Sequence, residues 1–461
     1  MMAGPTEENS FREYDSLWQL FADCTEHFRD EPLFVSRNET VSYKEFRART
    51  LGLSERFRNI TQNKIIISAA DPLFFAECFF AAVFSGHIAC LLSPECSVPE
   101  FFEDAYIVND GIRPPAGPAI DSEDFRPAQC LPDEPCLIVF SSGTTGRADG
   151  IMLSQRNILR NLRAILEVYH HGRGERLLHI LPYWHMFGLT GDLLMPLCGG
   201  SVICLPDSEA GILPAMRRFR PEIINMPPAM AEMLCELFER EGNTDAAGGC
   251  LKRVMCGGAP LSTGTFDRLL KFGIKPLTAY GMTECSPCVS AMPEDTLRRG
   301  SAGKLLSCWK IGFSKDNEIL LSGDCVMLGY YHNAGESEKR IRDGWFHTGD
   351  IGRIDAEGFI TVTGRMSSLL VFSNGVKCLP ERLEEKIGSL PGVRECMITK
   401  IPDAAGDHPG LIICAEKISE ETNDAIRSIM KEAHLFPFEL RSESAKLPRN
   451  RMGKLIREEN N

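Results

Sequence analysis

The chain alternates between short apolar runs and amphipathic segments through roughly its first 300 residues. Apolar runs of four or five residues bounded by turn signals predict buried strands. These runs cover 64–68, 89–92, 177–181, 201–205 and 222–225. The clearest helix is predicted after Ser154, a favourable N-cap, with Ile158, Leu162 and Ile165 on one face. Strands that alternate with helices in this way predict an α/β fold of stacked layers.

The most apolar stretch of the chain runs from Leu73 to Leu92. Glu77 and Gly86 interrupt it, so it falls short of the ~20 apolar residues that a membrane span needs. Gly86 divides the stretch into a helix at about 72–85 and a strand at about 87–92. We therefore expect a buried helix–strand pair and no transmembrane segment, with peripheral membrane contact left open.

The pattern changes after about residue 300. Antiparallel strands are predicted at 318–321 and 359–362, in a β-rich section. A small α+β module then follows Gly364. Its predicted elements are a strand at 369–372, a turn at Asn374–Gly375, a helix at 381–389, strands near 395–400 and 411–416, and a helix at 419–433. The chain is therefore expected to form a large domain, 1–364, and a small one, 365–461.

Composition and charge narrow the class of protein. A hydrophobic content of 43% and a charged content of 25% are ordinary for a soluble globular protein. The net charge of −13 argues against a dedicated nucleic-acid binder, although local basic patches remain possible. The 18 cysteines are scattered, Cys285 and Cys288 have no second pair at zinc spacing, and the N-terminus is polar. These features predict a cytoplasmic protein with free thiols.

The richest local motif is the loop that follows the apolar run 136–140. It contains two glycines and four hydroxyl residues, in the order Ser141-Ser-Gly-Thr-Thr-Gly146. Glycine permits close backbone approach, and hydroxyl and amide donors can hold phosphate oxygens. The spacing is not that of a Walker A loop. Taken alone, the loop is compatible with either a solvated turn or a phosphate site.

Further motifs follow in a fixed order. They are Tyr280-Gly-Met-Thr-Glu284, His347-Thr-Gly-Asp350, Gly364-Arg365 and Pro448-Arg-Asn-Arg-Met-Gly-Lys454. Together with the 141–146 loop they resemble the adenylate-forming superfamily, which includes acyl-CoA synthetases, adenylation domains and firefly-type luciferases. The resemblance runs from about residue 41 to Lys454. It implies a large domain that binds ATP and the acid, and a small mobile domain that carries a catalytic lysine.

The resemblance also assigns residues to the nucleotide. Thr144, Thr145 and Gly146 would hold the β- and γ-phosphates, Tyr280 would stack on adenine, and Asp350 would accept from the ribose hydroxyls. Arg365 would add a charged contact to ribose or phosphate. The full set of implied nucleotide-binding residues is Ser142, Thr144, Thr145, Gly146, Gly258, Ala259, Tyr280, Gly281, Asp350 and Arg365.

The implied catalytic residues are Lys454, Thr283 and His185. Lys454 would neutralise charge in the transition state, Thr283 would contact the α-phosphate or the acyl carboxylate, and His185 would form a wall or gate of the acid pocket. Glu284 and Thr144 would supply oxygen ligands for Mg²⁺. Ser368 stands at the implied hinge, where the family commonly has an acidic residue or lysine.

One position in the phosphate loop departs from the family pattern. The usual Pro-Lys-Gly is Ala148-Asp149-Gly150 here, so a carboxylate replaces an ammonium group. If Asp149 faces the phosphates, it opposes ATP binding. If it points elsewhere, the exchange is mild.

The expected function is ATP-dependent activation of a carboxylic acid to an acyl-adenylate with release of pyrophosphate. The acyl group would then pass to the thiol of CoA or of a carrier protein's phosphopantetheine. The segment Leu369–Glu381 resembles fatty-acyl ligases, which favours a fatty or other apolar acid. The alternatives are an amino-acid or aryl-acid adenylation enzyme that loads a carrier protein, and a non-catalytic nucleotide-binding relative.

Overall fold

The computed structural model describes residues 13–99, 102, 104–113, 125–140, 149–207, 211–373, 376–403, 406–415, 418–443 and 447. Internal contacts divide the chain into two units. The first comprises residues 1–311, 321–346 and 356–360, and the second comprises 312–320, 347–355 and 361–461. The chain therefore passes between the units several times before its C-terminal part begins.

The first unit contains a six-stranded sheet in the order β17-β7-β6-β4-β3-β5. Strands β6, β4, β3 and β5 run parallel to their neighbours in that part of the sheet, whereas β6–β7 and β7–β17 are antiparallel. The bounds are β3 (Lys64–Ser68), β4 (Ile88–Leu91), β5 (Tyr106–Asn109), β6 (Pro135–Phe140), β7 (Gly150–Ser154) and β17 (Gly329–Tyr331).

A nine-stranded sheet in the order β14-β13-β12-β11-β10-β8-β9-β1-β2 also belongs to this unit. Its central strands β12, β11, β10, β8, β9 and β1 are parallel. The bounds are β1 (Pro32–Val35), β2 (Thr40–Ser42), β8 (Arg176–Leu178), β9 (Val202–Cys204), β10 (Ile223–Met226), β11 (Arg253–Cys256), β12 (Lys275–Gly281), β13 (Cys288–Ala291) and β14 (Lys304–Leu305).

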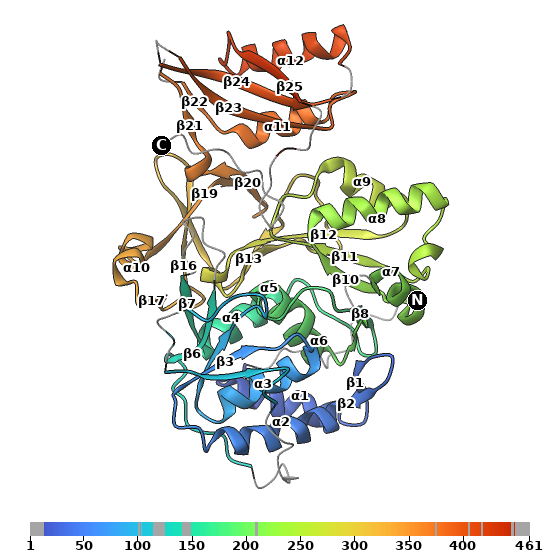
Figure 1. Cartoon of the computed structure of the whole chain (residues 1–461), viewed down its shortest axis with the longest axis vertical. Helices are drawn as coiled ribbons and strands as arrows, with labels where there is room; N and C mark the ends of the chain where they lie inside the picture. The colour runs from blue at the N-terminus through green and yellow to red at the C-terminus, as the bar shows by residue number, and fades with distance from the viewer. Residues whose placement is uncertain are drawn as a thin grey trace. The chain divides into compact units, whose positions relative to one another are not determined.

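Helices cover these sheets (Figure 1). Those of the first unit are α1 (Leu17–His27), α2 (Tyr43–Phe57), α3 (Pro72–Phe84), α4 (Gln155–Leu166), α5 (Met186–Gly188), the π-helix η2 (Leu189–Leu194), α6 (Met195–Gly199), α7 (Ile212–Phe219), α8 (Pro228–Glu241), η4 (Asp245–Ala247), α9 (Thr263–Lys271), η5 (Thr283–Cys285) and α10 (Ala334–Arg340). Helix α4 contacts β6, β7 and β13, so it packs against strands of both large sheets. Its apolar stripe accounts for this position.

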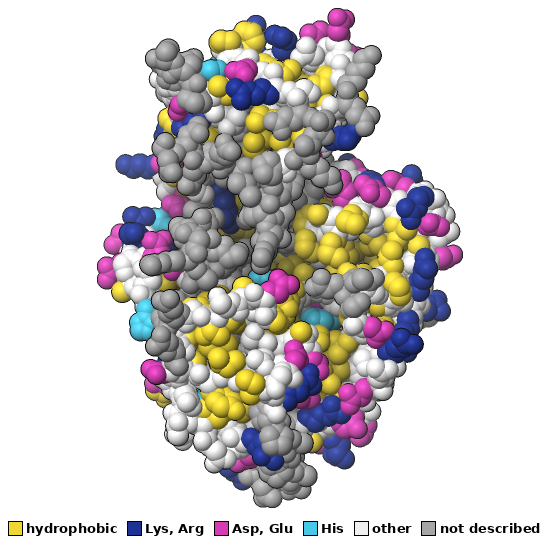
Figure 2. All heavy atoms as spheres, in the orientation of Figure 1, with side chains coloured by type: hydrophobic (Ala, Val, Ile, Leu, Met, Phe, Trp, Pro, Cys, Tyr) yellow, Lys and Arg dark blue, Asp and Glu magenta, His cyan; other side chains and the backbone are white. Residues whose placement is uncertain are grey.

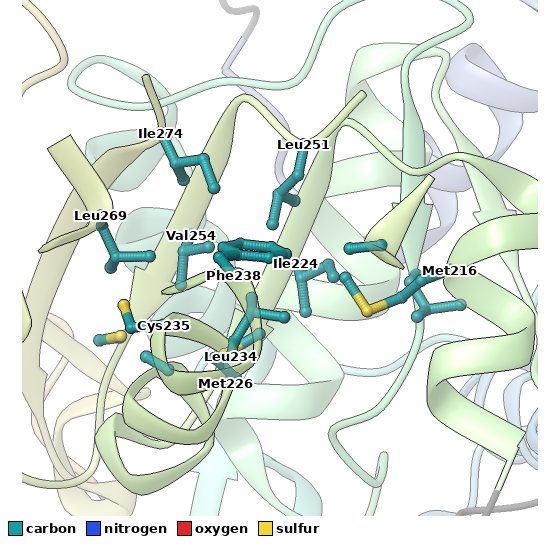
Figure 3. Close-up of a cluster of buried hydrophobic side chains, with 14 of the residues drawn as sticks. Met216, Ile224, Met226, Leu234, Cys235, Phe238, Leu251, Val254, Leu269 and Ile274 are labelled. Atoms are coloured by element: carbon teal, nitrogen blue, oxygen red, sulfur yellow. The ribbon is translucent and has the colours of Figure 1, made fainter. Parts of the chain in front are cut away.

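One apolar core lies beneath the nine-stranded sheet (Figure 3). Phe238 of α8 is fully buried there against strand residues such as Ile224 and Val254, and Leu269 of α9 closes the cluster. Fully burying side chains of this size stabilises a fold by about 1.5–3 kcal/mol each. This core packs against β10 and β11 up to their carboxyl ends, Met226 and Cys256.

A further sheet has the order β15-β16-β19-β18, with β20 paired to β19. Its strands are β15 (Lys310–Phe313), β16 (Glu318–Ser322), β18 (Ile341–Arg342), β19 (Trp345–Ile354) and β20 (Ile360–Arg365). The C-terminal part then adds η6 (Met366–Ser368), β21 (Leu370–Val371), β22 (Lys377–Cys378), α11 (Pro380–Gly388), β23 (Glu395–Asp403), β24 (Gly406–Cys414), α12 (Glu420–Glu432) and β25 (Glu439–Glu443). Its own apolar core includes Ile387, Ile398, Leu411 and Ile426.

The α/β prediction is confirmed, including the helix–strand pair around Gly86 and the small α+β module. The predicted strand at 177–181 is shorter than expected, since β8 ends at Leu178. The N–H groups of Ile180 and Leu181 instead donate to the carboxylate of Asp192. The predicted turn at Asn374–Gly375 lies outside the described residues.

The charged side chains and the cysteines are distributed as the sequence led us to expect. On the face shown in Figure 2, acidic and basic side chains are interspersed. All 18 cysteines are free thiols. Within the described ranges, no helix is both long and apolar enough to cross a bilayer.

Candidate active site

Two neighbouring strand ends carry the residues expected to hold adenine. Strands β11 and β12 are parallel, with Cys256 opposite Thr278. Gly258 and Ala259 follow β11, and Tyr280 and Gly281 are the last two residues of β12. Both ends therefore lie at the carboxyl edge of the sheet, where α/β folds bind ligands.

Glycine is required at two points of this edge. Gly258 has φ +81°, a left-handed conformation that side chains disfavour. A Cβ on Gly281 would lie 1.9 Å from the carbonyl oxygen of Pro287. Both positions belong to the expected nucleotide set, and both need the absence of a side chain for reasons of backbone geometry.

Glu284, the expected cation ligand, lies on the one-turn helix η5 directly after Thr283. Tyr330 donates a hydrogen bond from its phenol to Oε1 of Glu284 over 3.0 Å. The backbone N–H of Met327 donates to the carbonyl of Glu284 over 2.9 Å. The short segment 327–331 therefore holds Glu284 by both its side chain and its backbone.

The same segment reaches the exit of the phosphate loop. In the antiparallel pair β17–β7, Tyr330 lies opposite Ile151 and Tyr331 lies opposite Gly150. Phe140, the last residue before the loop, is paired with Gly150. Glu284 is thus connected through segment 327–331 to the strand on which the loop ends.

The phosphate-loop residues Ser142, Thr144, Thr145 and Gly146 lie outside the described residues. Asp149, the departure from the family pattern, is described. Its Oδ1 accepts a hydrogen bond from the side-chain amide of Asn333 at 3.2 Å.

His185 precedes α5, on the segment Leu181–Gly188. Burial lowers the pKa of its imidazole, so the ring is neutral at physiological pH. Phe187, two residues after His185, packs against Gly257. A Cβ added to Gly257 would lie 2.9 Å from the Phe187 ring. The His185 segment therefore packs beside the backbone that leads to Gly258 and Ala259.

Asp192 anchors the start of that segment. It is fully buried and accepts hydrogen bonds from the N–H groups of Ile180 and Leu181 and from the amide of Asn225, the last over 2.7 Å. His179 Nδ1 lies 3.3 Å from the same carboxylate. Because its carboxylate already accepts these hydrogen bonds, Asp192 acts as a structural anchor and not as a free acid facing a substrate.

A second cluster belongs to the other unit and contains the expected ribose ligand. Asp350 is buried, and its Oδ1 lies 2.8 Å from Nε of Arg365, whose side chain is 46% exposed. Glu318 holds the part of β19 that precedes Asp350, because its carboxylate accepts from the N–H of Gly349 at 2.9 Å and lies 3.0 Å from His347. The structure therefore brings Asp350 and Arg365 together.

Two further expected residues, Ser368 and Lys454, belong to the C-terminal part of the chain. Ser368, the implied hinge, ends the 3₁₀ helix η6, in which Leu369 N–H donates to Met366. Lys454 lies outside the described residues.

The structure also contains a cavity of about 300 Å³ beside α1 and α4. None of the expected site residues lines it.

The carboxylate of Glu284 can be compared with the oxygen ligands that a hard cation such as Mg²⁺ needs. Among the described residues, the Glu284 carboxylate accepts one hydrogen bond, on Oε1, which leaves Oε2 for a metal. No group of three or more potential protein ligands occurs in the described part of the chain. A single carboxylate oxygen of this kind fits Mg²⁺, which is usually bound through one or two carboxylates together with substrate phosphates.

Tyr330, Asn333, Glu318 and the anchoring role of Asp192 were not predicted from the sequence. Tyr330, Asn333 and Glu318 contact Glu284, Asp149 and Gly349 from 46, 184 and 31 residues away, whereas Asp192 acts within its own part of the chain. Gly329-Tyr-Tyr331 carried no motif by which to single it out. An apolar strand pattern would at most have marked it as buried.

Comparisons with known proteins agree with these motifs. The family model described as AMP-binding enzyme matches residues 102–331. A 2-succinylbenzoate–CoA ligase from Bacillus licheniformis is 30% identical over 368 residues, which is 74% of this chain and 74% of the relative. A feruloyl-CoA synthase from Amycolatopsis sp. is 30% identical over 310 residues, 63% of this chain and 62% of the relative. A long-chain-fatty-acid–CoA ligase from Salmonella typhimurium is 27% identical over 353 residues, 72% and 62% of the two chains.

Two solved structures show the same fold. ATP-bound MatB from Rhodopseudomonas palustris has a TM-score of 0.80 at 22% identity, over 95% of this chain and 96% of that one. O-succinylbenzoate coenzyme A synthetase from Bacillus subtilis, in complex with ATP and magnesium ion, has a TM-score of 0.79 at 21% identity, over 95% and 98%.

The chain thus belongs to the AMP-binding enzymes of the adenylate-forming superfamily, as the motifs predicted. Its relatives named above are CoA ligases and synthases. The match covers about three fifths of the length of the feruloyl-CoA synthases.

Proposed function

We propose that this protein joins a carboxylic acid to CoA in two steps at the expense of ATP. In the first, a carboxylate oxygen attacks the α-phosphorus, a new P–O bond forms, and pyrophosphate leaves. In the second, the CoA thiol attacks the acyl carbon, the thioester forms, and AMP leaves with the electron pair of the broken C–O bond. The thiol proton passes to solvent or to a basic group.

One observation carries the proposal. Glu284 follows Thr283 on helix η5, just after the strand that carries Tyr280, and segment 327–331 ties it to the exit of the phosphate loop. An aromatic face, a hydroxyl, a carboxylate and the loop exit are thereby connected through short contacts. Phosphoryl transfer depends mostly on such positioning and on charge stabilisation.

The roles proposed for individual residues follow the sequence resemblance. Thr144, Thr145 and Gly146 hold the β- and γ-phosphates, and Lys454 stabilises charge at the α-phosphate. Asp350 accepts from the ribose hydroxyls, and its ion pair with Arg365 orients the carboxylate for that task. Glu284 and Thr144 hold Mg²⁺, which when bound offsets the negative charge of the phosphates.

The acid is proposed to be apolar, either aliphatic or aromatic. An amino-acid substrate needs a free carboxylate for its ammonium group. The nearest candidate, Asp192, is fully buried and already accepts from two backbone N–H groups and Asn225. Trp184 packs between His185, with ring centroids 6.5 Å apart, and the buried Phe75, with ring centroids 6.3 Å apart, so the surroundings of His185 are aromatic. An aryl acid is supported by relatives named for feruloyl and succinylbenzoate substrates, and a fatty acid by one named for long-chain acids.

CoA is the proposed acceptor. The relatives are named for CoA, and nothing described supports a carrier protein.

Pyrophosphate release tests the proposal directly. The protein is incubated with ATP, Mg²⁺ and a panel of fatty, cinnamic, benzoic and amino acids, with and without CoA, and thioesters are identified by mass. We expect pyrophosphate with at least one apolar acid and a thioester only when CoA is present. Lys454→Ala serves as the control and should abolish pyrophosphate release while ATP still binds.

Two results would overturn the proposal. Release with amino acids alone would favour an amino-acid adenylation enzyme. ATP binding without turnover of any acid would favour a non-catalytic relative.

A further inference from the structure

Segment 327–331 contacts both Glu284 and strand β7. Met327 N–H donates to the Glu284 carbonyl at 2.9 Å, and the Tyr330 phenol donates to the Glu284 carboxylate at 3.0 Å. Leu328 N–H donates to the carbonyl of Met152 at 2.9 Å, and Tyr330 lies opposite Ile151. One short stretch of backbone thus fixes Glu284 relative to the strand that leaves the phosphate loop.

Tyr330 is itself held firmly. Its side chain is buried, with 6% of the residue exposed. Its backbone N–H donates to the Ser337 hydroxyl of α10 at 2.8 Å, in addition to the pairing with β7. A phenol that is fixed at its backbone and enclosed around its ring keeps its oxygen in one place, 3.0 Å from Oε1 of Glu284.

We propose that Tyr330 is a positioning residue for the divalent cation: it orients the Glu284 carboxylate so that Oε2 faces the metal that accompanies ATP. The inference rests on the proposed function, because it takes Glu284 as the cation ligand. Carboxylate ligands are commonly oriented by a hydrogen bond to the oxygen that does not bind the metal. A neutral phenol suits this task, since it fixes the carboxylate without cancelling the charge that attracts the cation.

The proposal separates Tyr330 from its neighbour Tyr331. Tyr331 follows Tyr330 on β17 and lies opposite Gly150 of β7. Its ring stacks on Phe102, with ring centroids 5.1 Å apart. Since successive side chains of a strand point to opposite faces, the two phenols face different surroundings. Tyr331→Phe therefore removes the same atom from the same strand and is a matched control.

Cation binding can be measured without turnover. Mn²⁺ is titrated into the full-length protein with saturating α,β-methylene ATP, whose α–β bond is not cleaved, and bound Mn²⁺ is followed by electron paramagnetic resonance. We expect Tyr330→Phe to weaken Mn²⁺ binding about tenfold, a typical loss when the partner of a metal ligand is removed. Tyr331→Phe should bind Mn²⁺ as the unmodified protein does.

A double-mutant cycle identifies the route of the effect. If Tyr330 acts through Glu284, the variant Tyr330→Phe/Glu284→Gln should bind Mn²⁺ no more weakly than Glu284→Gln alone. Nucleotide affinity without metal should be the same for Tyr330→Phe and the unmodified protein. This last readout distinguishes positioning from a general loss of structure.

The outcomes separate the inference from the function on which it rests. If the unmodified protein binds Mn²⁺ with the nucleotide, and Tyr330→Phe binds it equally well, the inference is wrong and the function stands. Additive losses in the double variant would also overturn it. If the unmodified protein binds no cation with the nucleotide, the proposed role of Glu284 fails first.

Discussion

The side-chain amide of Asn333 donates a hydrogen bond to the carboxylate of Asp149 over 3.2 Å. The oxygen of the same amide accepts from the N–H of Glu336, so Asn333 also caps helix α10. Asp149 stands where the family pattern has lysine. Its carboxylate is therefore engaged by a neutral donor that is fixed at a helix start.

This contact leads us to expect a small effect from restoring the family's charge. Asp149→Lys should change the dissociation constant for ATP by less than about threefold, and added salt should remove the difference. Calorimetric titration at two ionic strengths measures both. Two unit charges close to each other in partly screened solvent interact by roughly 1–4 kcal/mol. Tightening of tenfold or more would therefore mean that residue 149 faces the phosphates.

Asp350→Asn should act on the nucleotide and not on the acid. The amide keeps the shape of the side chain but weakens its acceptance from the ribose hydroxyls, and it loses the ion pair with Arg365. We expect a raised KM for ATP and an unchanged KM for the acid, both from initial rates of pyrophosphate release. A rise confined to the acid would remove Asp350 from the ribose.

Asp192→Asn should loosen the His185 segment. The buried carboxylate accepts from Ile180, Leu181 and Asn225, and an amide can replace only part of this set. Losing a buried charged acceptor costs about 2–4 kcal/mol. We expect a lower unfolding free energy in denaturant and a KM for the acid that rises more than the KM for ATP.

Asp207→Asn is a suitable control for that variant, since the Asp207 side chain is 56% exposed and lies 3.9 Å from Arg37. It should leave both quantities unchanged. If Asp192→Asn is equally stable, the anchor is not needed.

Glu77→Gln should stabilise the protein at alkaline pH. Burial in α3 raises the pKa of Glu77 to about 7. Its side chain is 13% exposed, and the nearest guanidinium nitrogen, of Arg49, is 3.8 Å away. Because the folded-state pKa exceeds the unfolded one, Glu77 contributes stability at low pH that is lost as pH rises through about 7.

We therefore expect Glu77→Gln to exceed the unmodified protein by about 1–3 kcal/mol at pH 8 and to match it near pH 4.5. Denaturant unfolding at the two pH values measures the difference. Glu241→Gln, at a side chain 47% exposed, should show no such pH dependence. A constant difference between Glu77→Gln and the unmodified protein at both pH values would contradict the prediction.

Local signals predicted much of the fold. Ser154 marked the start of α4, and the structure shows a capping box there between Ser154 and Asn157. The helix–strand division at Gly86 followed from a single glycine, which takes φ +86°. These features depend on residues within one or two turns of each other, so propensity and pattern suffice to find them.

The contacts that hold the candidate site were beyond such reasoning. Tyr330 and Glu284 are 46 residues apart, and Asn333 and Asp149 are 184 apart. Both contacts depend on the register between β17 and β7, which joins distant segments. Asp192 likewise shortened β8 by capturing N–H groups that the apolar pattern assigned to a sheet.

The hairpin formed by β6 and β7 has a consequence for how phosphate can be bound. In a P-loop enzyme the loop runs directly into a helix, whose positive N-terminal dipole attracts the anion. Here the chain returns as a strand, and the next helix begins only at Gln155, with its first turn capped by Ser154 and Asn157. At that helix start the N–H groups of Ser154 and Asn157 donate to each other's side chains, and the N–H of Arg156 donates to the carbonyl of Pro132. Attraction of the polyphosphate must then come from hydroxyl and amide donors and from cationic groups, and not from the dipole of that helix.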